Sequence, residues 1–179
     1  NKIYYSNDSL SVNNLRFYKN EQQILIRDDK RSKESAIEIV FSNFDLQNIA
    51  PFLEQTDFSI NGIMHGSLFL RSLFSNPYFT TDILASNFYL QKEFLGDLKI
   101  LSKYNTEQKY VDTDINIKYT GPAGVIEPIK LIGKFYPEKE DNNIDYSVNL
   151  TNYNIKTLSP FVKDFLDILD GKATGNLKI

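Results

Sequence analysis

Few side chains in this sequence could carry out chemistry. His65 is the one histidine, and the chain has no cysteine. A catalytic or metal-binding imidazole needs partners at matched spacing, and no second histidine exists to supply one. The absence of cysteine excludes thiol catalysis, disulfides and cysteine-ligated zinc. We therefore expect His65 to have no catalytic role.

Two aspartates stand two positions apart in a segment with strand periodicity. Asp112 and Asp114 would share one face of such a strand, because side chains alternate across it. Paired carboxylates in an Asp-x-Asp arrangement could hold a metal ion, as in some transferases. The alternative is a solvated outer face with no ligand, and we favour this alternative.

A second acidic segment mimics the start of a calcium-binding loop. Asp141, Asn143 and Asp145 have the right spacing, but Tyr146 stands where the loop needs glycine. Asn152 also replaces the terminal glutamate of such a loop. We interpret the segment as a polar turn, and we predict that the protein is not an enzyme and has neither a metal site nor a cofactor.

Composition limits the class of protein. The chain has 179 residues, 41% hydrophobic and 24% charged, with a net charge of −3. These values argue against a disordered segment and against a nucleic-acid binder, which needs clustered basic residues. The 13 Phe and 11 Tyr residues favour a sheet. Because the single methionine is Met64, we expect that other residues precede this sequence in the native protein.

Strand signals dominate the chain, and two amphipathic segments interrupt them. In Tyr110–Thr120, apolar and polar residues alternate strictly, which predicts a strand with one face in apolar surroundings. Asp145–Thr151 repeats the pattern. The segments Asp45–Gln55 and Asn154–Leu169 have helical apolar stripes, with Asp45 and Asn154 as candidate caps. Pro51 and Pro160 fall inside these stripes and predict a kink or a split.

Residues 41–70 and 150–179 align without a gap at an offset of 109. Six pairs are identical: Asn43/Asn152, Pro51/Pro160, Phe52/Phe161, Gly62/Gly171, Gly66/Gly175 and Leu68/Leu177. The alignment predicts a repeat protein in which each unit buries its apolar face against its neighbours. We divide the chain into the end of one unit (1–40), a complete unit (41–149) and the start of another (150–179), as a fragment of a longer protein.

The repeated block resembles the TamB and AsmA-like superfamily of bacterial envelope proteins. The resemblance rests on an aromatic-Asx-aliphatic step, then Pro-Phe, then Gly-x-x-x-Gly-x-Leu, and covers residues 36–179. Three further motifs fit the same family pattern: Asn76-Pro77, Phe94-Leu95-Gly96-Asp97 and Gly133-Lys134-Phe135-Tyr136. Residues 1–35 match no part of the family pattern.

The resemblance implies a mainly β fold: an elongated, curved antiparallel sheet, or β-taco, with two short amphipathic helices at the repeat starts. It implies a periplasmic segment of a protein anchored in the inner membrane, which conducts phospholipids between the inner and outer membranes. The partners would be phospholipid or another acyl-chain lipid, and an outer-membrane barrel protein of the translocation and assembly module. No nucleic acid is expected. The predicted groove-lining residues are Leu68, Leu70, Phe88, Leu90, Leu98, Ile100, Val111, Ile115, Ile117, Tyr119, Leu131, Phe135, Tyr146 and Val148.

Two alternatives stay open at this point. Alternating apolar residues are also the ordinary core of a β-sandwich, and a sheet folded on itself would use all of them. The family resemblance also allows a scaffold that adds a strand to a client during outer-membrane protein assembly or secretion.

Overall fold

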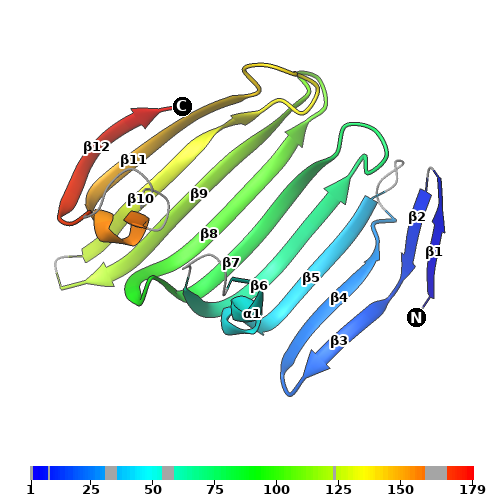
Figure 1. The fold of residues 1–179 in the computed structure, drawn as a ribbon, viewed down its shortest axis with the longest axis horizontal. Coiled ribbons are helices and arrows are strands. Elements are labelled where there is room, and N and C mark those ends of the chain that lie inside the picture. The colour runs from blue at the N-terminus through cyan, green and yellow to red at the C-terminus, as the bar shows by residue number, and fades with distance from the viewer. Residues whose placement is uncertain (1, 8, 31–35, 54–58, 123, 160–168) are drawn as a thin grey trace.

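The protein is dominated by a single antiparallel β-sheet of ten strands (Figure 1). A computed structural model describes residues 2–7, 9–30, 36–53, 59–122, 124–159 and 169–179. The elements in chain order are β1 (Lys2–Ser6), β2 (Ser9–Asn13), β3 (Leu15–Lys19), β4 (Gln22–Asp28), β5 (Ala36–Asp45), the 3-10 helix η1 (Leu46–Ile49), α1 (Ala50–Leu53), β6 (Ile60–Arg71), β7 (Tyr78–Leu90), β8 (Glu93–Asn105), β9 (Tyr110–Gly121), β10 (Gly124–Phe135), β11 (Ile144–Asn154), the 3-10 helix η2 (Ile155–Leu158) and β12 (Lys172–Lys178).

The sheet is a simple meander, in which each strand from β3 to β12 pairs with the next one along the chain. β3 and β12 therefore lie at opposite ends of the strand order, and the predicted mainly β, elongated antiparallel fold is confirmed. β1 and β2 form a separate hairpin beside the β4 end. Asp28 holds this hairpin, because its carboxylate accepts hydrogen bonds from Val12 N and Ser11 Oγ, each at 2.7 Å.

Only parts of the two predicted helices lie within the described residues. Where the sequence predicts a helix over Asp45–Gln55, the structure has η1 followed by α1, and residues 54 and 55 lie outside the described residues. After β11 only η2 is described, and residues 160–168 of the predicted second helix lie outside the described residues. Both predicted caps are confirmed: Asp45 Oδ1 accepts from Gln47 N at 2.9 Å, and Asn154 Oδ1 accepts from Lys156 N at 3.1 Å. Pro51 is the second residue of α1, in the first turn, where proline is tolerated although it has no N–H to donate.

Three asparagines interrupt the strands in the same way. Asn43, Asn87 and Asn152 each have φ close to +50°, and the pairing register shifts at each of them. A side chain on the adjacent strand accepts the backbone N–H of each asparagine. The acceptors are His65 Nδ1 for Asn43 (3.3 Å), Asp97 Oδ1 for Asn87 (2.9 Å) and Thr174 Oγ1 for Asn152 (2.9 Å). Such bulges bend a strand and increase its twist.

Each bulge also returns an aromatic residue to the apolar face of the sheet. The residue after each asparagine is Phe44, Phe88 or Tyr153, and all three belong to one buried cluster. Without the extra residue, strict alternation would place each ring on the other face. The bulges therefore build the core as well as the curvature.

The local structure of one bulge recurs 109 residues later. Asn43 and Asn152 share their conformation, and η1 and η2 begin at the matching positions Leu46 and Ile155. The strands before them, β5 and β11, end at Asp45 and Asn154. The division into repeat units stays a prediction. The bulges at Asn43 and Asn152 and the 3-10 helices that follow them nevertheless have equivalent backbone geometry at the offset of 109 residues.

The molecule exposes much more surface than a compact protein of its size. Its accessible surface is 12051 Å², whereas a compact monomer of 20.7 kDa exposes about 8,900 Å². A β-sandwich would cover one face of each sheet with another sheet. The described strands instead form one layer with a free apolar face, which corrects the sandwich alternative.

We predict that Asn87→Ala destabilises the protein by about 1 kcal/mol, whereas Asn87→Gly changes its stability by a few tenths. The reason is the positive φ, which costs alanine about 1–2 kcal/mol and glycine almost nothing. Urea denaturation of the two variants measures the difference. Equal destabilisation by both substitutions would mean that the asparagine side chain, and not its backbone conformation, is what the bulge requires.

Candidate functional site

One face of the sheet has an apolar row that crosses all ten strands. Residues paired in register lie on the same face, so successive pairs trace a line perpendicular to the strands. With strands about 4.8 Å apart, this line is about 43 Å long. We call it the central row, and it consists of Phe17, Ile24, Phe41, Gly66, Ile83, Ile100, Ile115, Leu131, Val148 and Leu177.

Four of the predicted lining residues belong to the central row: Ile100, Ile115, Leu131 and Val148. All four are half-buried, although they stand in the middle of a large sheet. A side chain at such a place is normally covered by a second layer. The incomplete burial shows that no described element covers this part of the face.

The apolar face continues toward the loops at one end of the strands. There Leu68 and Leu70 stand opposite Ile39 and Ile37 on the neighbouring strand β5.

Further along this end, a hollow of about 190 Å³ is lined by Phe79, Val111, Thr113, Phe135 and Tyr146. These residues come from β7, β9, β10 and β11, so the sheet curves enough for four strands to surround one space. Three of the lining residues, Val111, Phe135 and Tyr146, were predicted from the sequence.

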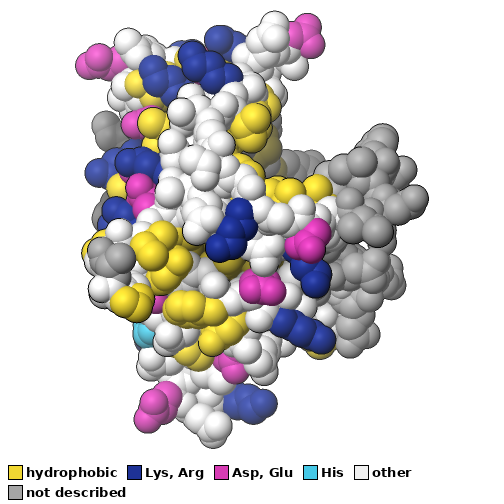
Figure 2. Space-filling view, turned by 90° about the vertical axis from the view of Figure 1, so that its left-hand side faces the viewer, with side chains coloured by type: hydrophobic (Ala, Val, Ile, Leu, Met, Phe, Trp, Pro, Cys, Tyr) yellow, Lys and Arg dark blue, Asp and Glu magenta, His cyan; other side chains and the backbone are white. Residues whose placement is uncertain are grey.

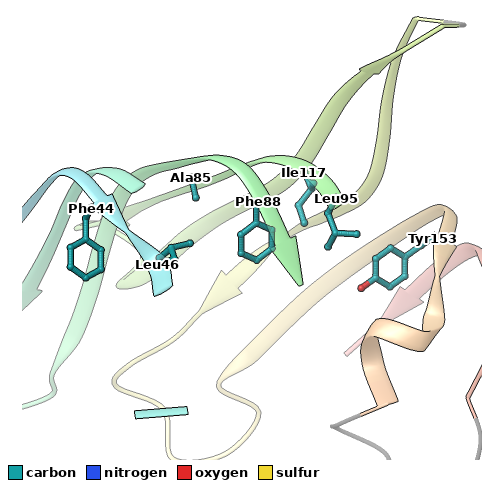
Figure 3. Packing of buried hydrophobic residues seen from close by; sticks show 7 residues of the cluster. All are labelled: Phe44, Leu46, Ala85, Phe88, Leu95, Ile117 and Tyr153. Carbon is teal, nitrogen blue, oxygen red and sulfur yellow. The ribbon is translucent and has the colours of Figure 1, made fainter. Parts of the chain in front are cut away.

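The other end of the strands is filled by side chains. Phe88 and Ile117 are 8% and 4% exposed and belong to the buried cluster, and Leu90 and Leu98 pack against it. Figure 3 shows the cluster side chains gathered on one side of the sheet, with the helical turn after β11 below Tyr153. These four predicted lining residues therefore belong to the core end of the face or adjoin it.

Tyr119 lies in a different environment from the other predicted residues. Its ring meets Phe94 edge-on at 6.2 Å, and Phe94 in turn contacts Tyr89 at 5.2 Å between ring centroids. Tyr89 and Phe94 are exposed. Tyr119 therefore forms part of an aromatic group near the ends of the strands.

Sequence reasoning missed a polar interruption of the apolar face. Thr81 and Ser102 are each 5% exposed, and Ser102 Oγ accepts from Thr81 N at 2.9 Å. Thr113, opposite Ser102, continues the hydroxyl line toward the 190 Å³ hollow. Alternation assigns all three residues to the apolar face, so their position gives no sign of a polar line. Only their hydroxyl side chains could have indicated it from the sequence.

The opposite face of the sheet is polar and charged. Lys103, Asp112, Lys134 and Asp145 stand opposite one another on β8, β9, β10 and β11, so charges of alternating sign cross four strands. Opposite charges paired across strands stabilise a sheet. Asp112 thus lies between two lysines, as the solvated-face alternative requires. Among the described residues, no group of three or more His, Asp or Glu side chains could hold a metal ion.

The other polar residues singled out in the sequence have local structural contacts. His65 accepts the hydrogen bond from Asn43 N at the first bulge. Asn143 O accepts from Tyr136 N at 2.7 Å and closes the β10–β11 turn, in the segment that resembled a calcium loop.

A larger hollow of about 680 Å³ lies between the β1–β2 hairpin and the β4–β5 end of the sheet. Its lining is mainly polar. Two ion pairs lie here, Arg27–Glu38 at 2.6 Å, which borders the hollow, and Arg71–Asp29 at 3.0 Å. This hollow differs from the apolar face and offers acyl chains little to contact.

Hydrophobic and charged side chains both reach the surface on the β12 side. Figure 2 shows hydrophobic side chains beside the hollow at the upper right, charged side chains along the upper left edge, and further hydrophobic side chains lower on the left. In the part of the chain that the structure describes, no helix is both long enough and apolar enough to span a membrane. The described residues form an apolar surface on one face of the sheet and a polar, charged surface on the other.

Comparison with family models, curated proteins and solved structures finds no match to this chain. The resemblance to the TamB and AsmA-like superfamily therefore stays a proposal that rests on the residues described above.

We predict that the two ends of the apolar face respond differently to truncation. Ile117→Ala should destabilise the protein by about 2–5 kcal/mol, because it leaves a cavity in the buried cluster. Ile115→Ala, two residues away on the same face, should cost about 1 kcal/mol, because its side chain is only half-buried. Equal losses in urea unfolding would contradict an uncovered central row.

A second prediction concerns alkaline pH. Burial raises the pKa of the Tyr153 phenol above its ordinary value of 10, and the hydrogen bond with Thr157 opposes this shift. The folded state therefore favours the protonated phenol. This contribution is complete below pH 10 and is lost as the pH rises through the folded-state pKa.

Thermal unfolding between pH 8 and pH 12 should show a loss of stability above pH 10 that is smaller in Tyr153→Phe. Identical pH profiles for the variant and the parent protein would contradict the assignment to Tyr153.

Proposed function

We propose that this chain is a segment of a hydrophobic groove that conducts phospholipids between the inner and outer membranes of a bacterial envelope. The observation that carries the proposal is the central row, an apolar line that crosses ten strands and is not covered by a second layer of the described residues. The resemblance of the repeated block to the TamB and AsmA-like superfamily supports the same function and a periplasmic location.

Physical chemistry explains why such a surface suits acyl chains. Transfer of a methylene out of water gains about 0.8 kcal/mol, so a phospholipid with some 30 methylenes gains on the order of 24 kcal/mol in an apolar environment. Aliphatic and aromatic side chains supply that environment without directional bonds. A lipid could therefore slide along the central row from strand to strand.

The outer face fits the same role. Its charged and amide side chains remain hydrated, and Lys99, Asn116 and Lys130 lie in register behind the central row. A polar outer face and an apolar inner face would let the segment remain in water while it shields acyl chains.

A carboxylate in the groove should displace lipid, whereas the same change on the outer face should not. We predict that Ile115→Asp lowers the phospholipid that co-purifies with the chain at least fivefold, because burying a charge against acyl chains is costly. Leu84→Asp is the matched control, since Leu84 lies on the outer face opposite Lys99 and is 42% exposed.

Native mass spectrometry and solvent extraction would measure the bound lipid, and circular dichroism would show that both variants fold. A parent protein that co-purifies with no lipid and does not bind fluorescent fatty acids would refute the proposal. Equal lipid loss in both variants would show that the central row is not the binding surface.

A second candidate function is a scaffold that adds a strand to a client during outer-membrane protein assembly. The specific observation in its favour is that β3 and β12 end the sheet with no described strand beyond them. Photocrosslinkers at Ile115 and Leu131 separate the two functions, because they should capture lipid in a groove and polypeptide in a scaffold that holds clients on this face.

A further inference from the structure

A second hollow lies at the same end of the strands as the apolar hollow of about 190 Å³. It has a volume of about 160 Å³ and is formed by the β6–β7 loop, the β10–β11 turn and the ends of β7 and β8. Figure 1 shows the β6–β7, β8–β9 and β10–β11 connections at one end of the sheet. We call this space the loop hollow, and its polar lining residues are Ser72, Ser75, Asn76, Tyr78, Tyr104 and Glu138.

The two hollows are adjacent both along the chain and across the sheet. Tyr78 lines the loop hollow, and the next residue, Phe79, lines the apolar hollow. Tyr104 lines the loop hollow and stands opposite Val111, which lines the apolar hollow. An amphiphile with its apolar part in the apolar hollow therefore brings its polar part to the loop hollow.

An exposed ion pair lies at the edge of the loop hollow. Among the described residues that line this hollow, Glu138 is the one with a charge. Its Oε2 accepts a hydrogen bond from Lys109 Nζ at 2.8 Å, and the side chains of Glu138 and Lys109 are 41% and 60% exposed. Such an exposed pair contributes little to stability, so a ligand can separate it at little cost. The pair can then serve a ligand that carries one positive and one negative group.

The aromatic residues at this end of the sheet already hold ammonium groups. Lys134 Nζ lies 4.4 Å from the centroid of the Tyr110 ring, and Lys139 Nζ lies 3.6 Å from the centroid of the Tyr136 ring. The face of an aromatic ring attracts a cation through its quadrupole. The surroundings of the loop hollow therefore suit a primary ammonium.

Charge and hydrogen bonding select among phospholipid headgroups. Residues 138–141 carry three acidic side chains and one lysine, so an anionic headgroup would meet an excess of carboxylates. A primary ammonium offers three N–H donors to the Glu138 carboxylate and to the other oxygen atoms of the lining. A trimethylammonium has no N–H to donate. The loop hollow therefore favours a headgroup with a primary ammonium close to a phosphate.

We propose that the two hollows together form a site for one phospholipid of the phosphatidylethanolamine class. An acyl chain lies in the apolar hollow, the headgroup ammonium pairs with Glu138, and the phosphate pairs with Lys109. This inference rests on the proposed function for its ligand, a phospholipid. It adds a preference for one headgroup, which conduction along the central row does not require.

Competition between lipids tests the preference on the 179-residue chain. The protein is mixed with equal amounts of phosphatidylethanolamine, phosphatidylglycerol and phosphatidylcholine that carry the same oleoyl chains, and native mass spectrometry measures each bound lipid. Phosphatidylethanolamine should bind about fivefold more than either of the others, as one partly exposed ion pair allows. Glu138→Gln should remove this preference without lowering the total bound lipid. Glu140→Gln is the matched control, since Glu140 is exposed in the same turn, does not line the loop hollow, and should leave the preference unchanged.

A zero-length crosslinker tests the position of the headgroup. A carbodiimide joins a carboxylate to a primary amine that touches it, so it should attach phosphatidylethanolamine to Glu138. Peptide mapping by mass spectrometry would identify the modified residue. Free phosphoethanolamine at the same concentration should label Glu138 much less, because it has no acyl chain for the apolar hollow to hold.

The inference and the proposed function fail in different ways. A parent protein that binds none of the three lipids would refute the proposed function, and this inference with it. Lipid binding without a headgroup preference, or a preference that Glu138→Gln leaves intact, would refute the inference alone. Crosslinks to other carboxylates but not to Glu138, or equal labelling by free phosphoethanolamine, would also overturn the assignment of this site to a phospholipid.

Discussion

The structure depends on one constraint: a sheet with one apolar face and no second layer must curve to shield that face. A flat sheet of this size would expose an apolar patch large enough to cause aggregation. Bulges at Asn43, Asn87 and Asn152 bend three of its strands, and each is fixed by a side-chain acceptor on the next strand. The same bulges direct aromatic rings into the core, so curvature and stability have a common origin.

This arrangement divides the apolar face into two parts with different roles. At one end of the strands, Phe44, Phe88 and Tyr153 join a buried cluster that holds the sheet together. Beyond it, Ile100, Ile115, Leu131 and Val148 of the central row stay half-buried, because no described element covers them. The core thus stabilises the fold without covering this part of the face with described residues, and in the proposed function this surface contacts acyl chains.

Periodicity predicts the strands well and the bulges poorly. Strict alternation located Tyr110–Thr120 within one residue of β9, and the residue types at the start of the two helical stripes located both caps. Alternation alone could not separate the core residue Ile117 from the half-buried Ile115, because both point to the same face and only tertiary packing distinguishes them. The position of a bulge asparagine does not follow from alternation, because the bulge is an extra residue that interrupts it. The line from Thr81 to Ser102 depends on contacts between strands, which sequence patterns do not show.

The most direct test of the account is a set of nuclear Overhauser measurements on methyl-labelled protein with bound phospholipid. The side chains to observe are Ile100, Ile115 and Leu131, which stand in the central row on three adjacent strands. The account predicts cross-peaks from their methyl groups to acyl-chain methylene protons, and few to side chains outside the neighbouring strands. Cross-peaks from these methyl groups to a second protein layer, with none to lipid, would contradict it.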